Sequence, residues 1–132
     1  MAKKRILIVE DDPSVLKVTK ARLEHEGYDV IPAMDGEQAL QRAMSKLPIH
    51  VILLDIRLPK LSGYDVCRAL KRQPATAEIP VIVFTASESQ LEWLADRCIE
   101  VGAADWIKKP FQTSELLAKI RHALDEEGNA HG

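Results

Sequence analysis

Three carboxylates, a hydroxyl and an ammonium group stand at the ends of apolar segments of this chain. Buried strands are predicted at residues 6–9, 49–54 and 81–84. Each of these segments is followed by polar residues: Asp11 and Asp12 after the first, Asp55 after the second and Thr85 after the third. Lys109 follows a later apolar segment. In a parallel α/β sheet the carboxyl ends of the strands meet at one edge, where ligands bind. The sequence therefore predicts one pocket for a divalent cation and a phosphoryl group.

The three carboxylates set the chemistry of that pocket. Two like charges about 4 Å apart repel by about 1 kcal/mol in water and by about 4 kcal/mol at an effective dielectric constant near 20, so the cluster needs a cation. Mg²⁺ prefers hard oxygen ligands and completes its shell with waters and phosphate oxygens. One carboxylate could then attack phosphorus to give an aspartyl phosphate. Lys109 and Thr85 would hold the phosphoryl oxygens.

Each of these residues also has an ordinary structural explanation. Asp12 could cap a helix that begins at Pro13, and Asp55 could form a turn. Thr85 could simply end a strand, and Lys109 could be a solvated surface charge. Complementary groups at successive strand ends on one edge are much less expected by accident, which favours a common site.

Short apolar segments alternate with helix-period segments, which predicts a doubly wound α/β domain with a parallel sheet. We expect five helices, beginning at Pro13, after Asp35 and Gly36, after Gly63, at a Ser87/Gln90 capping box, and before Leu117. Gly27, Pro48 and Gly102 should end the first, second and fourth. The predicted inward residues are Val15, Leu16, Val18, Leu23, Leu40, Ala43, Met44, Leu47, Val66, Cys67, Leu70, Leu91, Leu94, Ala95, Cys98, Leu117, Ile120 and Leu124.

The weaker apolar segments 28–31 and 104–107 are interrupted by Asp29 and Asp105, so we expect them at or near the sheet edges. A chain of 132 residues with 46% hydrophobic residues fits one domain, predicted at 1–125 with a polar tail at 126–132. No output domain is expected after residue 124.

Charge and targeting signals exclude several classes of function. The 18 basic and 20 acidic residues give a net charge of -2, which favours neither nucleic acid nor an anionic membrane as a partner. The N-terminus lacks a signal peptide and no segment is long enough to span a membrane, so we expect a cytoplasmic protein. Cys67 and Cys98 lack metal-ligand spacing and are expected to be reduced core residues.

At these residues the sequence resembles the receiver domain of bacterial two-component response regulators, over about residues 5–124. The resemblance rests on Glu10–Asp12 after the first strand, on 53–59 with Gly63, on 83–86, and on 106–111. It implies a flavodoxin-like (βα)5 fold with a parallel five-stranded sheet in the order 2-1-3-4-5.

The resemblance also implies roles for single residues. Asp55 would accept a phosphoryl group from the phosphohistidine of a histidine kinase or a histidine phosphotransfer protein. Asp11, Asp12, Asp55 and the backbone carbonyl of Arg57 would hold Mg²⁺. Such a receiver is no enzyme beyond catalysing its own phosphorylation and dephosphorylation. The side chain of Arg57 would lie where the attacking water approaches, so it is expected to affect phosphoryl lifetime.

Further positions would carry the signal outward. Thr85 and Trp106 correspond to the family's switch residues, although Tyr or Phe is usual where Trp106 stands. Lys109 would contact the phosphate and be followed by a cis bond to Pro110. Trp93 falls off the apolar stripe of its helix, so we expect an exposed effector surface on the fourth helix, fifth strand and fifth helix. A downstream effector protein or onward phosphotransfer would supply the output, and the receiver would be a monomer or weak dimer.

Three alternatives stay open from the residues alone. A haloacid-dehalogenase-like phosphatase would use an aspartyl nucleophile but needs an acid two positions later, where Arg57 stands. A flavodoxin-like binding module would bind a flavin phosphate after the first strand, where Glu10, Asp11 and Asp12 would repel it. A degenerate receiver could act only as a protein-binding scaffold, but no required site residue is missing.

Overall fold

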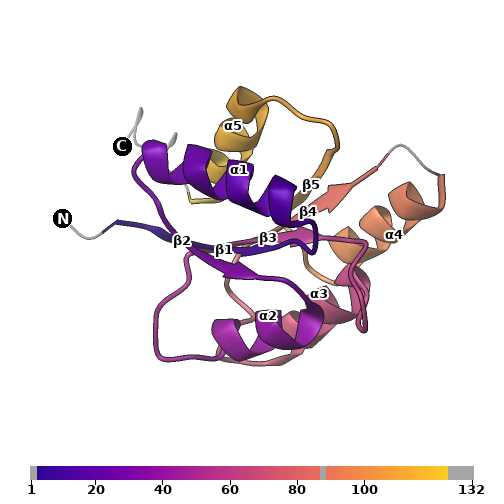
Figure 1. Cartoon of the computed structure of the whole chain (residues 1–132). Helices are drawn as coiled ribbons and strands as arrows, with labels where there is room; N and C mark the ends of the chain where they lie inside the picture. Colours follow the sequence, from indigo (N-terminus) through magenta and orange to yellow (C-terminus); the bar gives the residue numbers. More distant parts are fainter. Residues whose placement is uncertain (1–2, 87–88, 125–132) are drawn as a thin grey trace.

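The computed structural model describes residues 3–86 and 89–124 as strands that alternate with helices (Figure 1). The elements are β1 (Arg5–Val9), α1 (Pro13–His25), β2 (Asp29–Ala33), α2 (Gly36–Ala43), β3 (Val51–Asp55), α3 (Gly63–Arg72), β4 (Val81–Thr85), α4 (Ser89–Glu100), β5 (Asp105–Lys108) and α5 (Thr113–Ala123). Among the described residues, no helix combines the length and apolar character that a membrane crossing requires.

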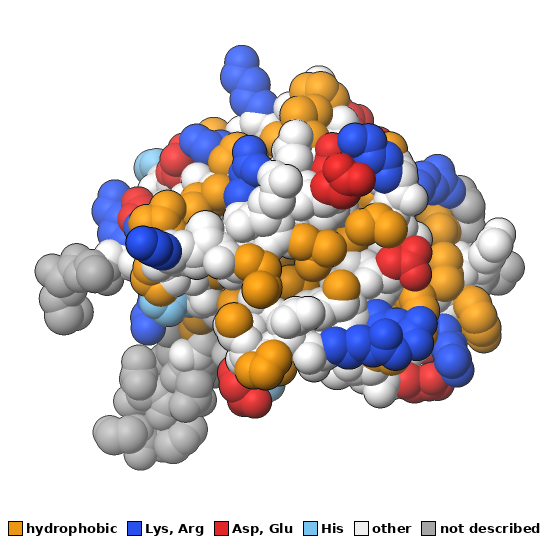
Figure 2. Space-filling view, turned by 90° about the horizontal axis from the view of Figure 1, so that it is seen from below, with side chains coloured by type: hydrophobic (Ala, Val, Ile, Leu, Met, Phe, Trp, Pro, Cys, Tyr) orange, Lys and Arg blue, Asp and Glu red, His pale blue; other side chains and the backbone are white. Residues whose placement is uncertain are grey.

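The five strands are all parallel and lie in the order β2-β1-β3-β4-β5, which confirms the predicted topology. As predicted, the two interrupted segments form the edge strands β2 and β5. Helices α1 and α5 cover one face of the sheet, and α2, α3 and α4 cover the other (Figure 1). Figure 2 shows the molecule from the side of α2, α3 and α4, where hydrophobic side chains lie among charged ones on the surface. All loops that follow the strands therefore open on one edge.

Alternation of side chains along the strands divides the core into two layers. In β1, Leu7 and Val9 face the α2–α4 layer, whereas Ile6 and Ile8 face the α1/α5 layer. Strands β3 and β4 follow the same rule, and every residue of both strands is buried. Continuous apolar strands of this kind are expected where helices cover both faces of a parallel sheet.

Local capping explains where the helices begin. The carboxylate of Asp12 accepts hydrogen bonds from the backbone N–H groups of Ser14 (2.9 Å) and Val15 (3.3 Å), and Pro13 occupies the first turn. Asp35 caps α2 in the same way through the N–H of Gln38, at 2.8 Å. After α1 the chain turns at Gly27, whose φ of +96° lies in the left-handed region that favours glycine.

The sequence prediction was wrong at the end of α2. The apolar stripe suggested a helix as far as Pro48, but α2 ends at Ala43, and Met44 and Leu47 are 50% and 52% exposed. The hydroxyl of Ser45 donates to the carbonyl of Arg42 (2.8 Å) and satisfies the last turn, so the chain leaves the helix before these side chains can reach the core.

One predicted core residue of α1 is also exposed. Val18 is 49% exposed, because α1 packs on the sheet through Thr19 and Leu23 and leaves Val18 outside this narrow face. The predicted inward residues of α3 are buried, and α4 and α5 place theirs inward as buried or half-buried side chains. The predicted capping box of α4 involves Ser87, which lies outside the described residues.

Candidate functional site

A pocket opens at the carboxyl edge of the sheet, where the predicted site residues meet. Its polar lining comes from the ends of β1, β3 and β4 and from the residue after β5, and comprises Glu10, Asp11, Asp12, Asp55, Arg57, Thr85 and Lys109. Because the neighbouring strands are parallel, residues far apart in the sequence reach this one place. The structure thus brings together all five residues from which the sequence argument started.

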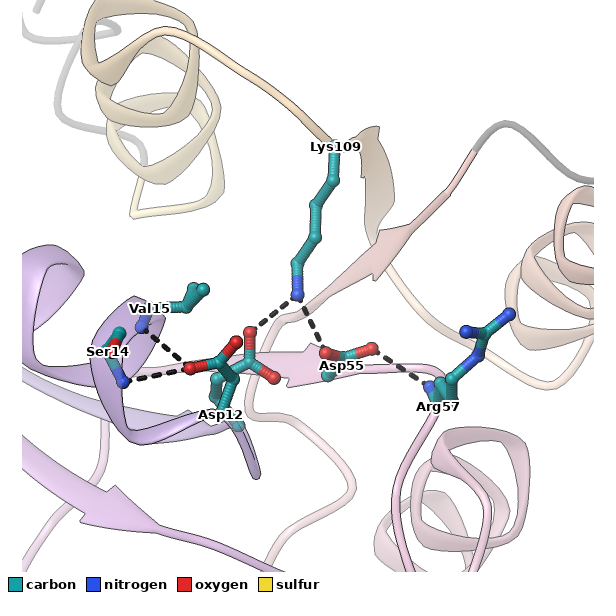
Figure 3. A network of polar contacts seen from close by, with 7 residues as sticks. Asp12, Ser14, Val15, Asp55, Arg57 and Lys109 are labelled. Atoms are coloured by element: carbon teal, nitrogen blue, oxygen red, sulfur yellow. Dashed lines mark hydrogen bonds and ion pairs between the residues drawn. The ribbon is translucent and has the colours of Figure 1, made fainter.

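Lys109 is the central cation of the pocket (Figure 3). Its ammonium group donates to Oε1 of Glu10 at 2.5 Å and to Oδ2 of Asp55 at 2.8 Å. The backbone holds it there, because the Lys109 N–H donates to the carbonyl of Thr85 at 2.7 Å. The peptide bond between Lys109 and Pro110 is cis, as predicted.

Asp55 is 7% exposed, and both oxygens of its carboxylate accept hydrogen bonds. Its Oδ2 binds Lys109, and its Oδ1 accepts a hydrogen bond from the backbone N–H of Arg57 at 2.9 Å (Figure 3). The following turn closes tightly, since the Gly63 N–H donates to the carbonyl of Ile56 at 2.9 Å. A Cβ at Gly63 would lie 2.5 Å from Asp55 O and Ile56 Cα, so only glycine fits.

The carboxylate cluster differs in one member from the predicted set. Glu10, Asp11 and Asp55 each offer an oxygen, and these atoms lie within 4.8 Å of one another. Asp12 lines the pocket, but its Oδ1 is used to cap α1. From the sequence, Glu10 marks the end of the first strand and is one of the acids that would repel a flavin phosphate, but it is not expected to hold the cation. The structure gives it the position beside Asp11 and Asp55 that the sequence argument had assigned to Asp12.

Burial makes Glu10 an unusual acid. The residue is 1% exposed, and its Oε2 has no hydrogen-bond partner among the described residues. Burial first, and then the neighbouring Asp55 carboxylate, raise the pKa of Glu10 to about 8, although Lys109 opposes the shift. Burial lowers the pKa of Lys109, but its hydrogen bonds with Asp55 and Glu10 outweigh this effect and raise it. An unpartnered buried oxygen among three acids fits a cation site.

The predicted switch residues occupy different environments. Thr85 is 1% exposed at the end of β4 and lines the pocket. Trp106 of β5 is half-buried and packs against the α2–α4 layer of the core. Two residues later, Lys108 forms an ion pair of 2.9 Å with Glu92 of α4. Edge strand β5 is therefore tied directly to α4.

A family model described as the response regulator receiver domain matches residues 6–121. The chain belongs to this family. Among curated relatives, the receiver is 40% identical over 126 residues to the probable transcriptional regulator ycf27 of Porphyridium aerugineum, covering 94% of this chain and 49% of that protein. It is 38% identical over 121 residues to the alkaline phosphatase synthesis transcriptional regulatory protein PhoP of Bacillus subtilis, covering 92% and 48% respectively. The chain thus spans about half the length of these relatives.

Solved structures agree with the receiver fold. A CheY-like response regulator receiver domain protein from Methanospirillum hungatei matches with a TM-score of 0.86 at 32% identity, covering 98% of this chain and 99% of that one. The receiver domain of a sensor histidine kinase from Pseudomonas aeruginosa matches with a TM-score of 0.85 at 34% identity, covering 94% and 99%. That structure has a magnesium ion coordinated in its active site cleft.

Proposed function

We propose that this receiver is a phospho-acceptor signalling switch in which Asp55 takes a phosphoryl group from a phosphohistidine of a histidine kinase or histidine phosphotransfer protein. The observation that carries the proposal is the contact of Lys109 with Asp55 and Glu10 inside the acidic pocket. Lys109 neutralises part of the carboxylate charge and can follow the phosphoryl oxygens once they arrive.

Mg²⁺ is the cofactor that suits this pocket. Glu10, Asp11, Asp55 and the backbone carbonyl of Arg57 would hold it, whereas Asp12 is engaged as a helix cap. The bound ion would screen the charge between Asp55 and the incoming phosphoryl group. The magnesium ion in the Pseudomonas receiver structure supports this choice. The Arg57 N–H donates to Oδ1 of Asp55 and keeps this carboxylate oriented. Thr85 lines the same pocket at the end of β4, so a phosphoryl group on Asp55 would act on β4 and its neighbour β5 through Thr85.

The output surface would be formed by α4, β5 and α5. Trp93 is 59% exposed on α4, and the Arg97 guanidinium lies 5.6 Å from its ring centroid. The Glu92–Lys108 ion pair connects this part of α4 to the strand that carries Trp106. A phosphoryl-dependent change at Thr85 and Trp106 would alter this surface for a downstream effector or for onward phosphotransfer. The expected setting is cytoplasmic, with the receiver a monomer or weak dimer.

The direct test is phosphorylation with a small phosphodonor such as acetyl phosphate. With Mg²⁺ we expect one acid-labile phosphoryl group per chain by intact mass, and none without Mg²⁺ or in Asp55→Asn. Asp96→Asn, an exposed acid on α4, is the matched control and should be labelled like the wild type. Labelling of Asp55→Asn at the wild-type level would refute the acceptor assignment, and absence of labelling in the wild type would favour a scaffold.

The same preparation separates the switch from a phosphatase. A switch reacts stoichiometrically with the donor and then stops until its own phosphoryl group is lost, so release from a phosphate ester such as p-nitrophenyl phosphate should not continue. Sustained turnover that Asp55→Asn abolishes would favour an enzyme.

Separately, Trp93→Ala should weaken effector binding while labelling of Asp55 stays normal, and unchanged binding would remove Trp93 from the output surface.

A further inference from the structure

The loop between β3 and α3, residues 56–62, packs against the start of α2. Leu61 of this loop lies so close to Gly36 that a Cβ on Gly36 would be 2.8 Å from Leu61 Cβ. It would also be 2.8 Å from Cγ2 of Val66 in α3. Gly36 does not have a positive φ, so the glycine is needed here for space and not for its backbone conformation. A larger residue at the start of α2 must therefore displace the loop or α3.

Lys60, the residue before Leu61, makes a second contact with α2. Its φ of +69° lies in the left-handed region, which is uncommon for a residue with a side chain and persists where surrounding contacts hold it. Its ammonium group lies 3.8 Å from Oδ2 of Asp35 and 3.9 Å from Oε2 of Glu37. Asp35 is the N-cap of α2, so the cation reaches carboxylates at the beginning of this helix. Exposed ion pairs are individually weak, but these two act on the same loop as the Leu61 contact.

The same loop carries the backbone of Arg57 beside Asp55. The Arg57 N–H donates to Oδ1 of Asp55 at 2.9 Å (Figure 3), and the Arg57 carbonyl is one of the proposed Mg²⁺ ligands. The loop is short, and the Leu61 N–H donates to the carbonyl of Pro59 at 2.8 Å, only two residues after Arg57. Because these turns follow each other directly, a displacement of Leu61 moves the backbone of Arg57.

We propose that Gly36, Lys60 and Leu61 are positioning residues that hold the Arg57 backbone against Asp55 and thereby set the Mg²⁺ affinity of the pocket. None of the three is among the described residues that line the pocket, so they act through Arg57. Residues behind the ligands of a metal orient those ligands, and their substitution typically lowers metal affinity. The Mg²⁺ part of this inference rests on the proposed function, whereas the orientation of the Arg57 N–H does not.

The first test compares two neighbouring amides by hydrogen exchange of the full chain, followed by NMR without Mg²⁺. The Arg57 N–H binds Asp55, whereas the Ile56 N–H donates to the carbonyl of Phe84 in β4 and continues the sheet. In Gly36→Ala we expect Arg57 to exchange about tenfold faster relative to Ile56, because the loop opens locally. A general loss of stability would accelerate both amides. An unchanged ratio of the two exchange rates in folded Gly36→Ala would overturn the proposal.

Further variants separate the loop contact from ordinary packing. Gly102→Ala is the matched glycine control, since its Cβ would meet the Lys71 side chain at 3.2 Å in the turn before β5, and it should leave the exchange ratio unchanged. Leu61→Ala adds no atom to α2 and should raise the ratio, so it decides the proposal if Gly36→Ala does not fold. Ile79→Ala, half-buried on the same core layer before β4, should not raise it. An equal rise in Ile79→Ala would refute a specific role of the loop contact.

The contribution of Lys60 is tested through its charge. Lys60→Met should raise the exchange ratio about twofold, a small effect because its ion pairs are exposed, and Lys60→Arg should restore the wild-type ratio. At high salt the wild type and Lys60→Met should converge, because exposed charges are screened. Equal ratios in Lys60→Met and the wild type at low salt would remove Lys60 from the positioning residues.

The last test measures Mg²⁺ binding by titration, with the NMR signal of the Arg57 amide as the reporter. We expect the dissociation constant for Mg²⁺ to rise about tenfold in Gly36→Ala and Leu61→Ala and to stay unchanged in Ile79→Ala. An unchanged constant in variants whose Arg57 amide exchanges faster would contradict the effect on the metal. If the wild type binds no Mg²⁺, the metal assignment of the proposed function fails, and the exchange ratio alone then decides the positioning roles.

Discussion

Charged residues lie both at the edge of the sheet where the strands begin (the amino edge) and at the edge where they end (the carboxyl edge), but they are paired differently at the two edges. At the amino edge, Arg5 donates to the carbonyl of Pro48 at 3.1 Å and pairs with Asp29 at 3.9 Å, and its N–H donates to Nδ1 of His50 at 2.9 Å. At the carboxyl edge, Lys109 faces Glu10 and Asp55, and Glu10 keeps a buried oxygen without a partner among the described residues. One edge satisfies its polar groups, whereas the other concentrates unbalanced charge.

This difference separates charge that supports the fold from charge that is available for chemistry. A half-exposed ion pair such as Arg5–Asp29 contributes about 0–1 kcal/mol and has little reason to change with ligands. Buried acids that repel each other are tolerated only where another requirement keeps them, and they respond strongly to a cation or a phosphoryl group. Matched substitutions at the two edges test this distinction.

The largest difference should come from two glycines. Gly63→Ala forces a methyl group to 2.5 Å from the backbone beside Asp55, so we expect the free energy of unfolding to fall by about 3 kcal/mol. Gly27→Ala at the amino edge meets no atom within 4 Å and adds only left-handed backbone strain, about 1 kcal/mol. Urea unfolding measures both. Equal losses would mean that the turn after Asp55 is more adaptable than its contacts indicate.

The next effect concerns the two cations. Lys109→Met leaves Glu10 and Asp55 without their common partner, and we expect a loss of about 2 kcal/mol in the absence of Mg²⁺. Arg5→Met should cost less than about 1 kcal/mol. Added Mg²⁺ should restore part of the loss in Lys109→Met and none in Arg5→Met. A loss that Mg²⁺ does not change would contradict the placement of the cation beside these acids.

The smallest effect has the opposite sign. Glu10→Gln removes a buried carboxylate whose pKa is raised to about 8, so the metal-free protein should gain about 1 kcal/mol at neutral pH. A carboxyl group with a raised pKa contributes its full stability only below the pKa that it has in the unfolded chain, and this contribution is lost as the pH rises to about 8. The gain in stability from Glu10→Gln should therefore grow between these two pH values. Asp29→Asn should change stability by less than about 0.5 kcal/mol. Thermal unfolding across pH compares the two, and a pH-independent gain would contradict the assignment.

Much of the site was predictable because strand ends are visible in the sequence. Asp55 and Lys109 follow apolar segments and were correctly expected to meet. Glu10 was missed although a signal existed, since it continues the alternation of Ile6 and Ile8 on one face of β1. Asp12 directly before Pro13 carries the opposite signal, that of a helix cap. Alternation and capping together would have selected Glu10 as the acid that lies with Asp11 and Asp55.

Other features depend on tertiary contacts that one sequence does not reveal. The apolar period of Met44 and Leu47 is typical of a helix, but it carries no information on whether a neighbour exists to bury them. Likewise, the helical stripes placed Cys67 and Cys98 in the core, but that they belong to one core cluster depends on how α3 and α4 pack on the sheet. Hydrophobic periodicity identifies the apolar face of a helix, but only the tertiary structure shows which faces contact each other.

Strand β5 separates the consequences of neighbouring substitutions. Trp106 packs against the α2–α4 layer and Lys108 pairs with Glu92 of α4, whereas Asp105 pairs with Lys119 of α5 at 3.0 Å and Ile107 is buried in the α1/α5 layer. Substitutions at residues 106 and 108 should therefore affect the α2–α4 layer, whereas substitutions at residues 105 and 107 should affect the α1/α5 layer. Substitutions in β5 can therefore alter either helical layer separately, while the residue that follows the strand, Lys109, stays in the pocket.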